Sequence, residues 1–270
     1  MNSDSDNEGL VWQTGIWDKI SDVYQEEVDH RFVPVVDGVI GRAQIKAGDH
    51  VLDLGTGTGS VALRLASVLG DEGRVVGHDI SQDMLRIATQ KANELHLTNI
   101  EFQEGRAESI PAEDSSFDVV LASLSLMYVI DRGTAAREIG RVLRTGGRFV
   151  AAVWAAANEC DIVLFQQTAG GFAPPPPVPG VGPGAMADPS EFIGQLLTSG
   201  IQAQVEGQLL SFEFDDFESA WDVLAGVTTA SLAPDIQEQA KNAVRNLMWN
   251  DAAGPRSFQN NTQFIIGQAQ

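Results

Sequence analysis

The residues best suited to chemistry lie in one short stretch and in an aspartate that follows it. The stretch, Val51 to Ser60, reads Val-Leu-Asp-Leu-Gly-Thr-Gly-Thr-Gly-Ser, and the next apolar run ends at Asp79. The apolar residues are typical of a buried parallel strand. The three glycines allow backbone angles closed to other residues and let a ligand approach the main chain. We therefore expect a ligand to lie across this turn.

Three ligands were compared for the turn. A phosphate-binding loop needs a lysine after its last glycine, and none is present. A dinucleotide site needs a glycine at position 60, where Ser60 stands, and Asp53 would repel a pyrophosphate. S-adenosylmethionine (SAM) carries a cationic sulfonium and a cationic amino group, which an acid favours. Asp79 stands where an acid can accept both ribose hydroxyls. SAM is the favoured ligand, and a dinucleotide is the weaker alternative.

Strands alternate with helices around this stretch, which predicts an α/β fold with a parallel sheet and right-handed crossovers. Two helices precede it, at 16–29 and 33–44, after a loose tail at 1–10. The expected strands are 50–54, 74–78, 100–103, a run from 117 to 121 and 148–153, and the expected helices are 59–69, 82–95 and 133–143.

The pattern changes after Trp154. A helix at about 158–170 precedes a segment from 171 to 184 that is rich in proline and glycine and is read as a stiff loop or a mobile lid. Helices at 189–199, 217–226 and 234–250 and strands at 201–207 and 262–266 complete the prediction.

Three further stretches of the sequence match the pattern of one protein family. They are Gly105-Arg-Ala-Glu-Ser-Ile-Pro111, Asp114-Ser-Ser-Phe-Asp-Val-Val120 and the run from Arg137 to Arg148. Together with the glycine turn and Asp79, they resemble the class I SAM-dependent methyltransferases over about 17–154, in the style of the ubiquinone/menaquinone-biosynthesis branch. The resemblance implies a Rossmann-like, doubly wound, seven-stranded sheet, mostly parallel with an antiparallel last strand, plus a helical cap. It also implies a single domain over 1–270, with residues 1–45 covering the cofactor and cap insertions at 155–200 and 211–257.

The resemblance implies a role for each matching residue. Asp79 would hold the ribose, Ile80 and Met84 would flank the adenine, and Ser123 and Leu124 would approach the sulfonium. The full expected cofactor site is Tyr24, Asp53, Gly55, Thr56, Gly57, Asp79, Ile80, Met84, Arg106, Ala107, Glu108, Ser123 and Leu124. Family members often carry Asp at the position of Arg106, and because arginine only donates, that adenine contact is in doubt.

Structural roles stay open beside these. Asp79 can cap the helix that starts near Ser81, and Ile80 and Met84 can belong to the core. Tyr24 can pack the first helix onto the sheet, and Glu108 can be a solvated loop acid.

Methyl transfer depends mainly on alignment and needs a base only if the nucleophile must lose a proton. The catalytic candidates are His30 and Tyr128. His30, past the first helix, is the candidate base. Tyr128 stands where many relatives carry histidines, which removes an obvious base; it can position a substrate or equally be core. The candidate walls of the acceptor pocket are Trp154, Phe172 and Trp221.

Charge and composition exclude some function classes. The net charge is −20, from 37 acids and 17 bases, so phosphate backbones and anionic membranes would be repelled. A single cysteine, Cys160, rules out an intrachain disulfide and a cysteine-based metal site, and no metal is expected. The N-terminus lacks the features of a signal peptide, so a cytoplasmic protein is expected, as a monomer or homodimer.

These observations predict a SAM-dependent methyltransferase, with S-adenosylhomocysteine as product, that acts on a small, apolar or aromatic metabolite. Two alternatives stay open. One is a protein or tRNA methyltransferase, although the segment after the fourth strand, Ala122-Ser-Leu-Ser125, lacks the Asn/Asp-Pro-Pro-Tyr/Phe motif of such enzymes. The other is a non-catalytic SAM-fold binding protein.

Overall fold

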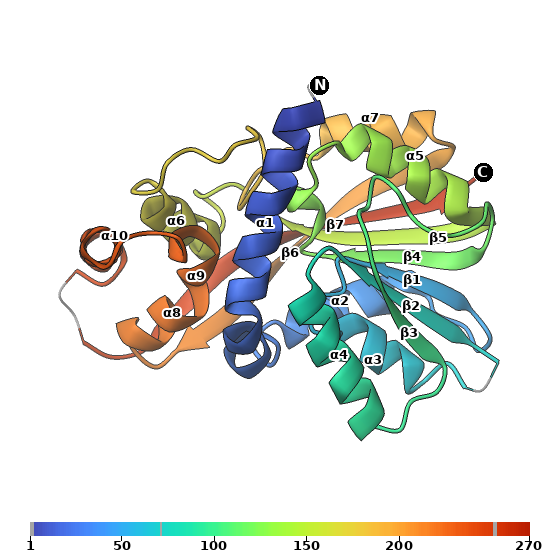
Figure 1. Ribbon diagram of the computed structural model, residues 1–270, viewed down its shortest axis with the longest axis horizontal. Helices are drawn as coiled ribbons and strands as arrows, with labels where there is room; N and C mark the ends of the chain where they lie inside the picture. The colour runs from blue at the N-terminus through green and yellow to red at the C-terminus, as the bar shows by residue number, and fades with distance from the viewer. Residues whose placement is uncertain (1–2, 71, 251–252) are drawn as a thin grey trace.

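The computed structural model describes residues 3–70, 72–250 and 253–270 and has one seven-stranded sheet at its centre (Figure 1). The strand order is β3-β2-β1-β4-β5-β7-β6. The strands are β1 (His50–Leu54), β2 (Arg74–Asp79), β3 (Ile100–Glu104), β4 (Phe117–Ser123), β5 (Leu143–Trp154), β6 (Ile201–Phe214) and β7 (Arg256–Ala269).

Strand direction and order confirm the predicted Rossmann-like sheet. β1 pairs in parallel with β2 and β4, and the parallel ladders continue to β3 and β5. β7 is antiparallel to both β5 and β6. The chain reverses its direction of travel across the sheet between β1 and β4, and ligands of such sheets bind at the carboxyl ends of the strands beside that reversal.

Helices cover both faces of the sheet (Figure 1). α2 (Val33–Ala43), α3 (Ser60–Ala66) and α4 (Gln82–Glu94) cover one face, and α5 (Arg132–Val142) and α7 (Ser190–Thr198) cover the other. The central strands are almost fully buried because both faces are covered; in β1, for example, Val51 has no exposed surface. Residues 105–116 connect β3 to β4 as a loop that contains no helix.

The first helix is longer than the sequence predicts. α1 spans Ser3–Val23, and a π-helical turn, η1 (Tyr24–Val28), continues it. The prediction of a loose tail at 1–10 was therefore wrong for residues 3–10, while residues 1–2 lie outside the described residues. Near its start, α1 packs against Val178 of the proline-rich segment. The contact at Gly9 is so close that an added Cβ would lie 2.4 Å from the Val178 side chain. Tertiary packing stabilises helices that propensity alone does not.

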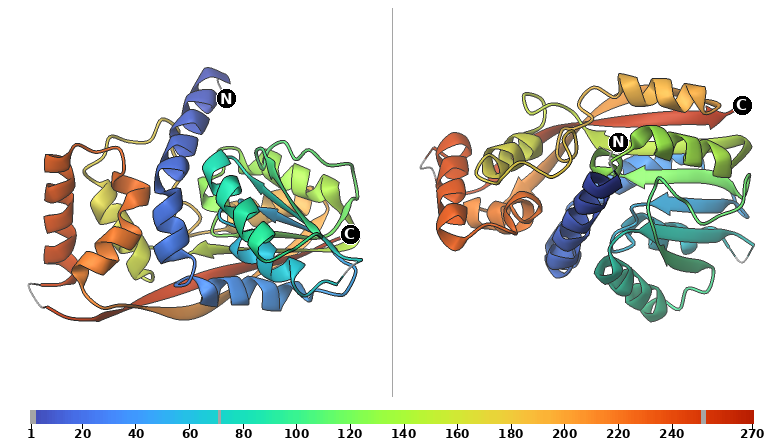
Figure 2. Two further views of the ribbon diagram at one scale, coloured as in Figure 1. Left: turned by 60° about the horizontal axis from the view of Figure 1, so that its bottom comes forward. Right: turned by 45° about the horizontal axis from the view of Figure 1, so that its top comes forward.

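β6 and β7 extend beyond the sheet as a long antiparallel ribbon and carry the cap at its far end (Figure 2). The cap consists of α8 (Phe217–Leu224), α9 (Gly226–Thr229) and α10 (Pro234–Met248), which are joined by α6 (Asp161–Gly170). Both ribbon strands are longer than predicted, since cross-strand hydrogen bonds continue through polar residues such as Asn260, which is fully buried. α1 stands between the sheet and the cap (Figure 2).

The segment 155–200, expected to belong to a cap, divides between two parts of the structure. α6 packs with the cap helices, but α7 packs against α5 and β6 on the body of the sheet. The proline-rich segment is tied to the body as well, because the Gly182 N–H donates to the Met127 carbonyl and Arg132 donates to the Gly180 carbonyl. It contains no helix or strand, as predicted for its composition.

Among the described residues, no helix combines the length and the apolar character that crossing a lipid bilayer requires. Across residues 3–70, 72–250 and 253–270, no group of three or more His, Cys, Asp and Glu side chains is placed to hold a metal ion.

Candidate functional site

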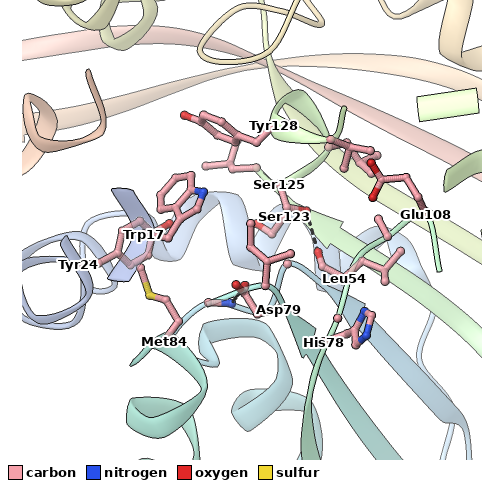
Figure 3. A pocket seen from close by; sticks show the side chains of 18 residues that line it. Trp17, Tyr24, Leu54, His78, Asp79, Met84, Glu108, Ser123, Ser125 and Tyr128 are labelled. Atoms are coloured by element: carbon pink, nitrogen blue, oxygen red, sulfur yellow. Dashed lines mark hydrogen bonds between the residues drawn. The ribbon is translucent and has the colours of Figure 1, made fainter. Parts of the chain in front are cut away.

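A pocket lies at the carboxyl ends of β1, β2 and β4, beneath the first helix, and we call it the main pocket (Figure 3). Its walls come from the glycine turn, the start of α4, the loop after β3, the segment after β4, and α1 with η1. The lining residues are Trp17, Tyr24, Leu54, Gly55, Gly57, His78, Asp79, Ile80, Met84, Gly105, Ala107, Glu108, Ser123, Leu124, Ser125, Leu126, Tyr128 and Val129.

The glycine turn needs its glycines for two different reasons. Gly55 and Gly57 both have positive φ, 68° and 54°, which is strained for other residues. A Cβ at Gly55 would lie 2.3 Å from the Ser125 side chain, so close packing requires glycine there. A Cβ at Gly57 would meet nothing within 4 Å, so this residue borders open space on the pocket side. The turn thus offers bare main chain to a ligand, as the sequence predicts.

Asp79 connects the turn to the next strand. Its Oδ2 accepts a hydrogen bond from the Gly57 N–H at 2.8 Å, and its Oδ1 accepts one from the Ser81 N–H at 2.9 Å. Burial raises the pKa of the Asp79 carboxyl. Each oxygen has a second lone pair, so the carboxylate can still accept ligand hydroxyls. The capping role goes to Ser81, whose Oγ accepts from the Met84 N–H. Asp79 is therefore left facing the pocket.

Asp53 lies beneath the turn in a second, smaller hollow that shares Tyr24, Gly55 and Gly57 with the main pocket. The Thr56 hydroxyl donates to Asp53 Oδ2 at 2.7 Å, while Asp53 Oδ1 is buried and has no hydrogen-bond partner among the described residues. Burial raises the pKa of Asp53 to about 7. A cationic ligand group near this hollow would stabilise the ionised carboxylate.

The apolar and acidic walls lie on opposite sides of the main pocket. Figure 3 shows Trp17, Tyr24 and Met84 on one side and Glu108 and His78 on the other. Met84 is 2% exposed, so it contributes to the core as well as to the pocket wall. No Lys or Arg side chain lines the main pocket within the residues that the structure describes. The pocket is therefore suited to a ligand with an apolar ring and a positive charge.

Arg106 is the one expected cofactor residue that does not line either hollow. Its guanidinium is 3.3 Å from Glu108 Oε1, and Glu108 also accepts from the Asp131 N–H. The ion pair holds the Arg106 guanidinium against Glu108, which itself lines the main pocket. The other expected cofactor residues line the main pocket or the smaller hollow around Asp53.

The two tyrosines of the chain both line the main pocket. The Trp17 ring stands edge-on to both, with ring centroids 6.3 Å from Tyr24 and 4.9 Å from Tyr128. Burial raises the pKa of each phenol above its ordinary value, so both stay protonated at neutral pH. Tyr128 therefore does not fit the role of a general base.

Four residues expected at the catalytic and acceptor sites do not line the main pocket. His30 is exposed and lines neither the main pocket nor the hollow around Asp53. Trp154 is buried in a cluster with Phe32 and Phe212, and Trp221 packs against Phe165 and Phe217 in the cap. Phe172 is 38% exposed.

Some lining residues were missed. Trp17 and His78 were not among the expected site residues. The spacing of seven between Trp17 and Tyr24 places both on one helical face, and His78 directly precedes Asp79. Burial lowers the pKa of His78 to about 4, so it is neutral at physiological pH.

Asp29, just after η1, holds the N-terminal segment against the turn. Its carboxylate accepts hydrogen bonds from the Thr58 and Ser60 hydroxyls, and the Lys91 ammonium lies 2.6 Å from Oδ2. These contacts join α1 and η1 to the glycine turn and to α4. They position Tyr24 over the pocket.

Comparison with known proteins agrees with this geometry. Residues 45–169 match the family model described as "Methyltransferase domain". The matched region is a little less than half of the chain. It contains the glycine turn, Asp79 and the segment after β4, so most of the main pocket lies in the part that is similar to a methyltransferase domain.

Curated relatives match the same methyltransferase domain. The chain is 38% identical over 109 residues to demethylmenaquinone methyltransferase of Oceanobacillus iheyensis, covering 40% of this chain and 46% of that protein. It is 39% identical over 110 residues to ubiquinone/menaquinone biosynthesis C-methyltransferase UbiE of Xylella fastidiosa, covering 40% of this chain and 44% of that protein. The match thus spans less than half the length of these curated relatives.

Solved structures extend the similarity in fold to most of the chain. The YcgJ protein from Bacillus subtilis has a TM-score of 0.66 at 23% identity and covers 88% of this chain and 98% of its own. A SAM-dependent methyltransferase from Aquifex aeolicus has a TM-score of 0.56 at 15% identity, with 93% and 98% covered. The [4+2]-cyclase SpnF has a TM-score of 0.58 at 22% identity, with 87% and 80% covered. The fold is shared by proteins of differing described activity, so the reaction must be argued from the site.

Proposed function

We propose that the protein transfers the methyl group of SAM to a small, largely apolar acceptor. The observation that carries the proposal is the acidic, lysine- and arginine-free pocket around the glycine turn, with Asp79 bound to the Gly57 N–H. The family match supports the same cofactor.

The pocket residues fit SAM on three points. Asp53, whose Oδ1 has no hydrogen-bond partner within the described part of the chain, would face the cationic methionine end through the shared hollow. Asp79 would accept from the ribose hydroxyls, and Ile80 with Met84 would pack on the adenine. Glu108, held by the Asp131 N–H, would lie at the edge of the ring. Tyr24, Gly55, Thr56, Gly57, Ala107, Ser123 and Leu124 complete the proposed cofactor site.

When bound, SAM supplies a methyl carbon already activated by the neighbouring sulfonium. The acceptor's electron pair forms the new bond to that carbon as the carbon–sulfur bond breaks, which leaves S-adenosylhomocysteine. The chain's own contribution would be to hold both molecules in line and to exclude water, and alignment of this kind supplies much of a rate enhancement. Trp17, Tyr24 and Tyr128 would form the cover that excludes water.

No general base is assigned in this proposal. His30 is exposed, and the phenols of Tyr24 and Tyr128 stay protonated because burial raises their pKa. An acceptor that is already nucleophilic, or that loses its proton to solvent, suits such a site.

Methyl transfer from methyl-labelled SAM tests the proposal. The acceptors would be a panel of small phenols, quinols and amines, with total tRNA and a protein mixture in parallel. We expect label in one or more small molecules and none in macromolecules. Label in tRNA or protein would favour a macromolecular substrate, and absence of label despite cofactor binding would favour a non-catalytic SAM-binding protein.

A further inference from the structure

β6 is the outermost strand of the sheet, and its free edge is long and open. The strand order ends in β5-β7-β6, so among the described residues β6 has a neighbouring strand only on its β7 side. Its ladder with β7 runs from Ile201↔Ala269 to Phe214↔Arg256 without a shift in register. Every residue from 204 to 209 is exposed. An open edge of this length can pair with a strand of another chain.

The main chain of β6 turns alternate residues toward the free edge. At its start, the Gln270 N–H donates to the Gly200 carbonyl, which places the even-numbered residues in the bonds to β7. Further along, Asn261 lies opposite Leu209 but exchanges its main-chain bonds with the segment between β5 and α6. Both observations give the same alternation. The odd-numbered residues therefore present their N–H and C=O groups at the free edge, namely Ala203, Val205, Gly207 and Leu209.

The edge lacks the features that commonly prevent strand pairing. Residues 201–214 contain no proline, lysine or arginine. The one charged residue between 204 and 209 is Glu206, and Arg42 of the same chain neutralises it. Arg42 Nε lies 3.1 Å from Glu206 Oε2, and Arg42 Nη2 lies 3.1 Å from Gln208 Oε1. Charge is therefore balanced locally at this edge.

Two apolar side chains stand uncovered beside the free main-chain groups. Val205 is 36% exposed and Leu209 is 64% exposed. They are four residues apart on one strand, so they lie on the same face of the sheet with Gly207 between them. A strand that paired with the edge would bring its own side chains against both. The best partner strand therefore carries two apolar residues at the same spacing, as β6 itself does.

A second copy of β6 matches the first in one antiparallel register, with the two-fold axis at Gly207. Val205 then lies opposite Leu209 of the second copy, and the same contact occurs twice. Glu206 lies opposite Gln208 and not opposite another acid. The odd-numbered residues face each other, so their free N–H and C=O groups can bond in pairs. An axis at Val205 would instead place Leu209 opposite Ile201, which is already fully buried.

We propose that β6 pairs with β6 of a second copy of this chain, antiparallel about a two-fold axis at Gly207, so that one sheet continues through both chains. The proposal goes beyond the proposed function and does not depend on the cofactor. Two paired edges bury little area, so we expect a dissociation constant on the order of 10 µM. The net charge of −20 on each copy opposes association, so the dimer should become tighter as the salt concentration rises.

Sedimentation velocity on the full chain, from about 1 to about 200 µM, tests the pairing, and we expect a shift from monomer to dimer. Leu209→Glu places a charge against Val205 of the second copy and should weaken the dimer at least about tenfold, since the symmetry makes each substitution act twice. The control Leu95→Glu changes a leucine that is 60% exposed at the end of α4 and should leave the dimer unchanged.

A main-chain variant keeps the test independent of that side chain. Gly207→Pro removes the N–H at the axis without removing a bond to β7 and should weaken the dimer by about as much as Leu209→Glu. Circular dichroism would confirm that each variant is folded. A native chain that stays monomeric at the highest concentration would overturn the pairing and leave the edge to a strand of another protein. A dimer that neither variant weakens would overturn it as well.

Cysteine cross-linking tests the register. Gly207→Cys places two thiols opposite each other at the axis, at a spacing that a disulfide can bridge, and should give a covalent dimer on mild oxidation. Ser211→Cys, also exposed on β6, should not, because the axis separates its two copies by eight residues along the strands. The native Cys160 is 1% exposed and should not interfere. Cross-linking of Ser211→Cys but not of Gly207→Cys would contradict the proposed register.

Discussion

The main-chain N–H of Gly57 donates to Oδ2 of Asp79 at 2.8 Å, across the gap between the β1 turn and the end of β2. One carboxylate thus fixes the shape of the glycine turn and also faces the pocket that the turn borders. The relationship joins fold and proposed function, because the same oxygen that orders the turn is available to a ligand hydroxyl.

Asp79→Ala should weaken S-adenosylhomocysteine binding by about 100-fold, since two hydrogen bonds to a charged acceptor would be lost. The measurement is calorimetric titration at pH 7.5, with circular dichroism to confirm the fold. Asp83→Ala removes a half-exposed acid from the same region, which pairs with Arg86, and should leave the affinity within twofold. Equal losses in both variants would contradict the ribose contact.

Asp53 should make cofactor affinity depend on pH. Burial raises its pKa to about 7, so it is mostly protonated at pH 6 and mostly ionised at pH 8. A cationic ligand group binds the ionised form, and affinity for S-adenosylhomocysteine should rise up to about tenfold between these pH values. Asp53→Asn should bind with little change across the same range. A native affinity that is flat or falls with rising pH would contradict this role.

The same group has an opposite effect on stability. Because the folded-state pKa of Asp53 lies above its value of 3.8 in the unfolded chain, the native state holds the extra proton, and stability falls as pH rises from about 4 to about 7. Asp53→Asn should therefore be more stable than the native chain at pH 8, by roughly 2 to 4 kcal/mol in urea denaturation. Asp37→Asn, on an exposed ion pair, should change stability little.

His78 should contribute to acid sensitivity. Burial lowers its pKa to about 4, below the value of 6.5 in the unfolded chain. Its contribution to the free energy of unfolding is therefore fully present above pH 6.5 and is lost as the pH falls toward 4. His78→Leu should flatten the stability curve within that window, as followed by thermal unfolding. His30→Gln changes an exposed histidine and should leave the curve unchanged.

Asp29→Ala should loosen the N-terminal helix. It removes the partner of Lys91 and of the Thr58 and Ser60 hydroxyls and should cost about 2 kcal/mol. Limited trypsin digestion should then cut faster after Lys19, a readout that reports α1 directly. An unchanged cleavage rate at Lys19 would show that these contacts do not hold the helix in place.

The sequence predicted the sheet and the glycine turn because their signals are local. The turn needs glycines at fixed places, and Asp79 stands at a strand end, so position determines where these residues lie. The placement of Arg106 was not predicted, because the sequence does not determine that its guanidinium pairs with Glu108.

The arrangement of the cap was not predicted, because it depends on contacts between distant segments. Trp154 is buried beside Phe32 and Phe212, and Trp221 packs against Phe165 in the cap. Neither aromatic cluster follows from residue type or local spacing.

The measurement closest to the main conclusion is calorimetric titration of the native chain with S-adenosylhomocysteine. We predict saturable binding at one site per chain, with affinity that Asp79→Ala reduces sharply. Absence of binding at millimolar S-adenosylhomocysteine, in a chain that is folded by circular dichroism, would contradict the assignment of the main pocket as a SAM site.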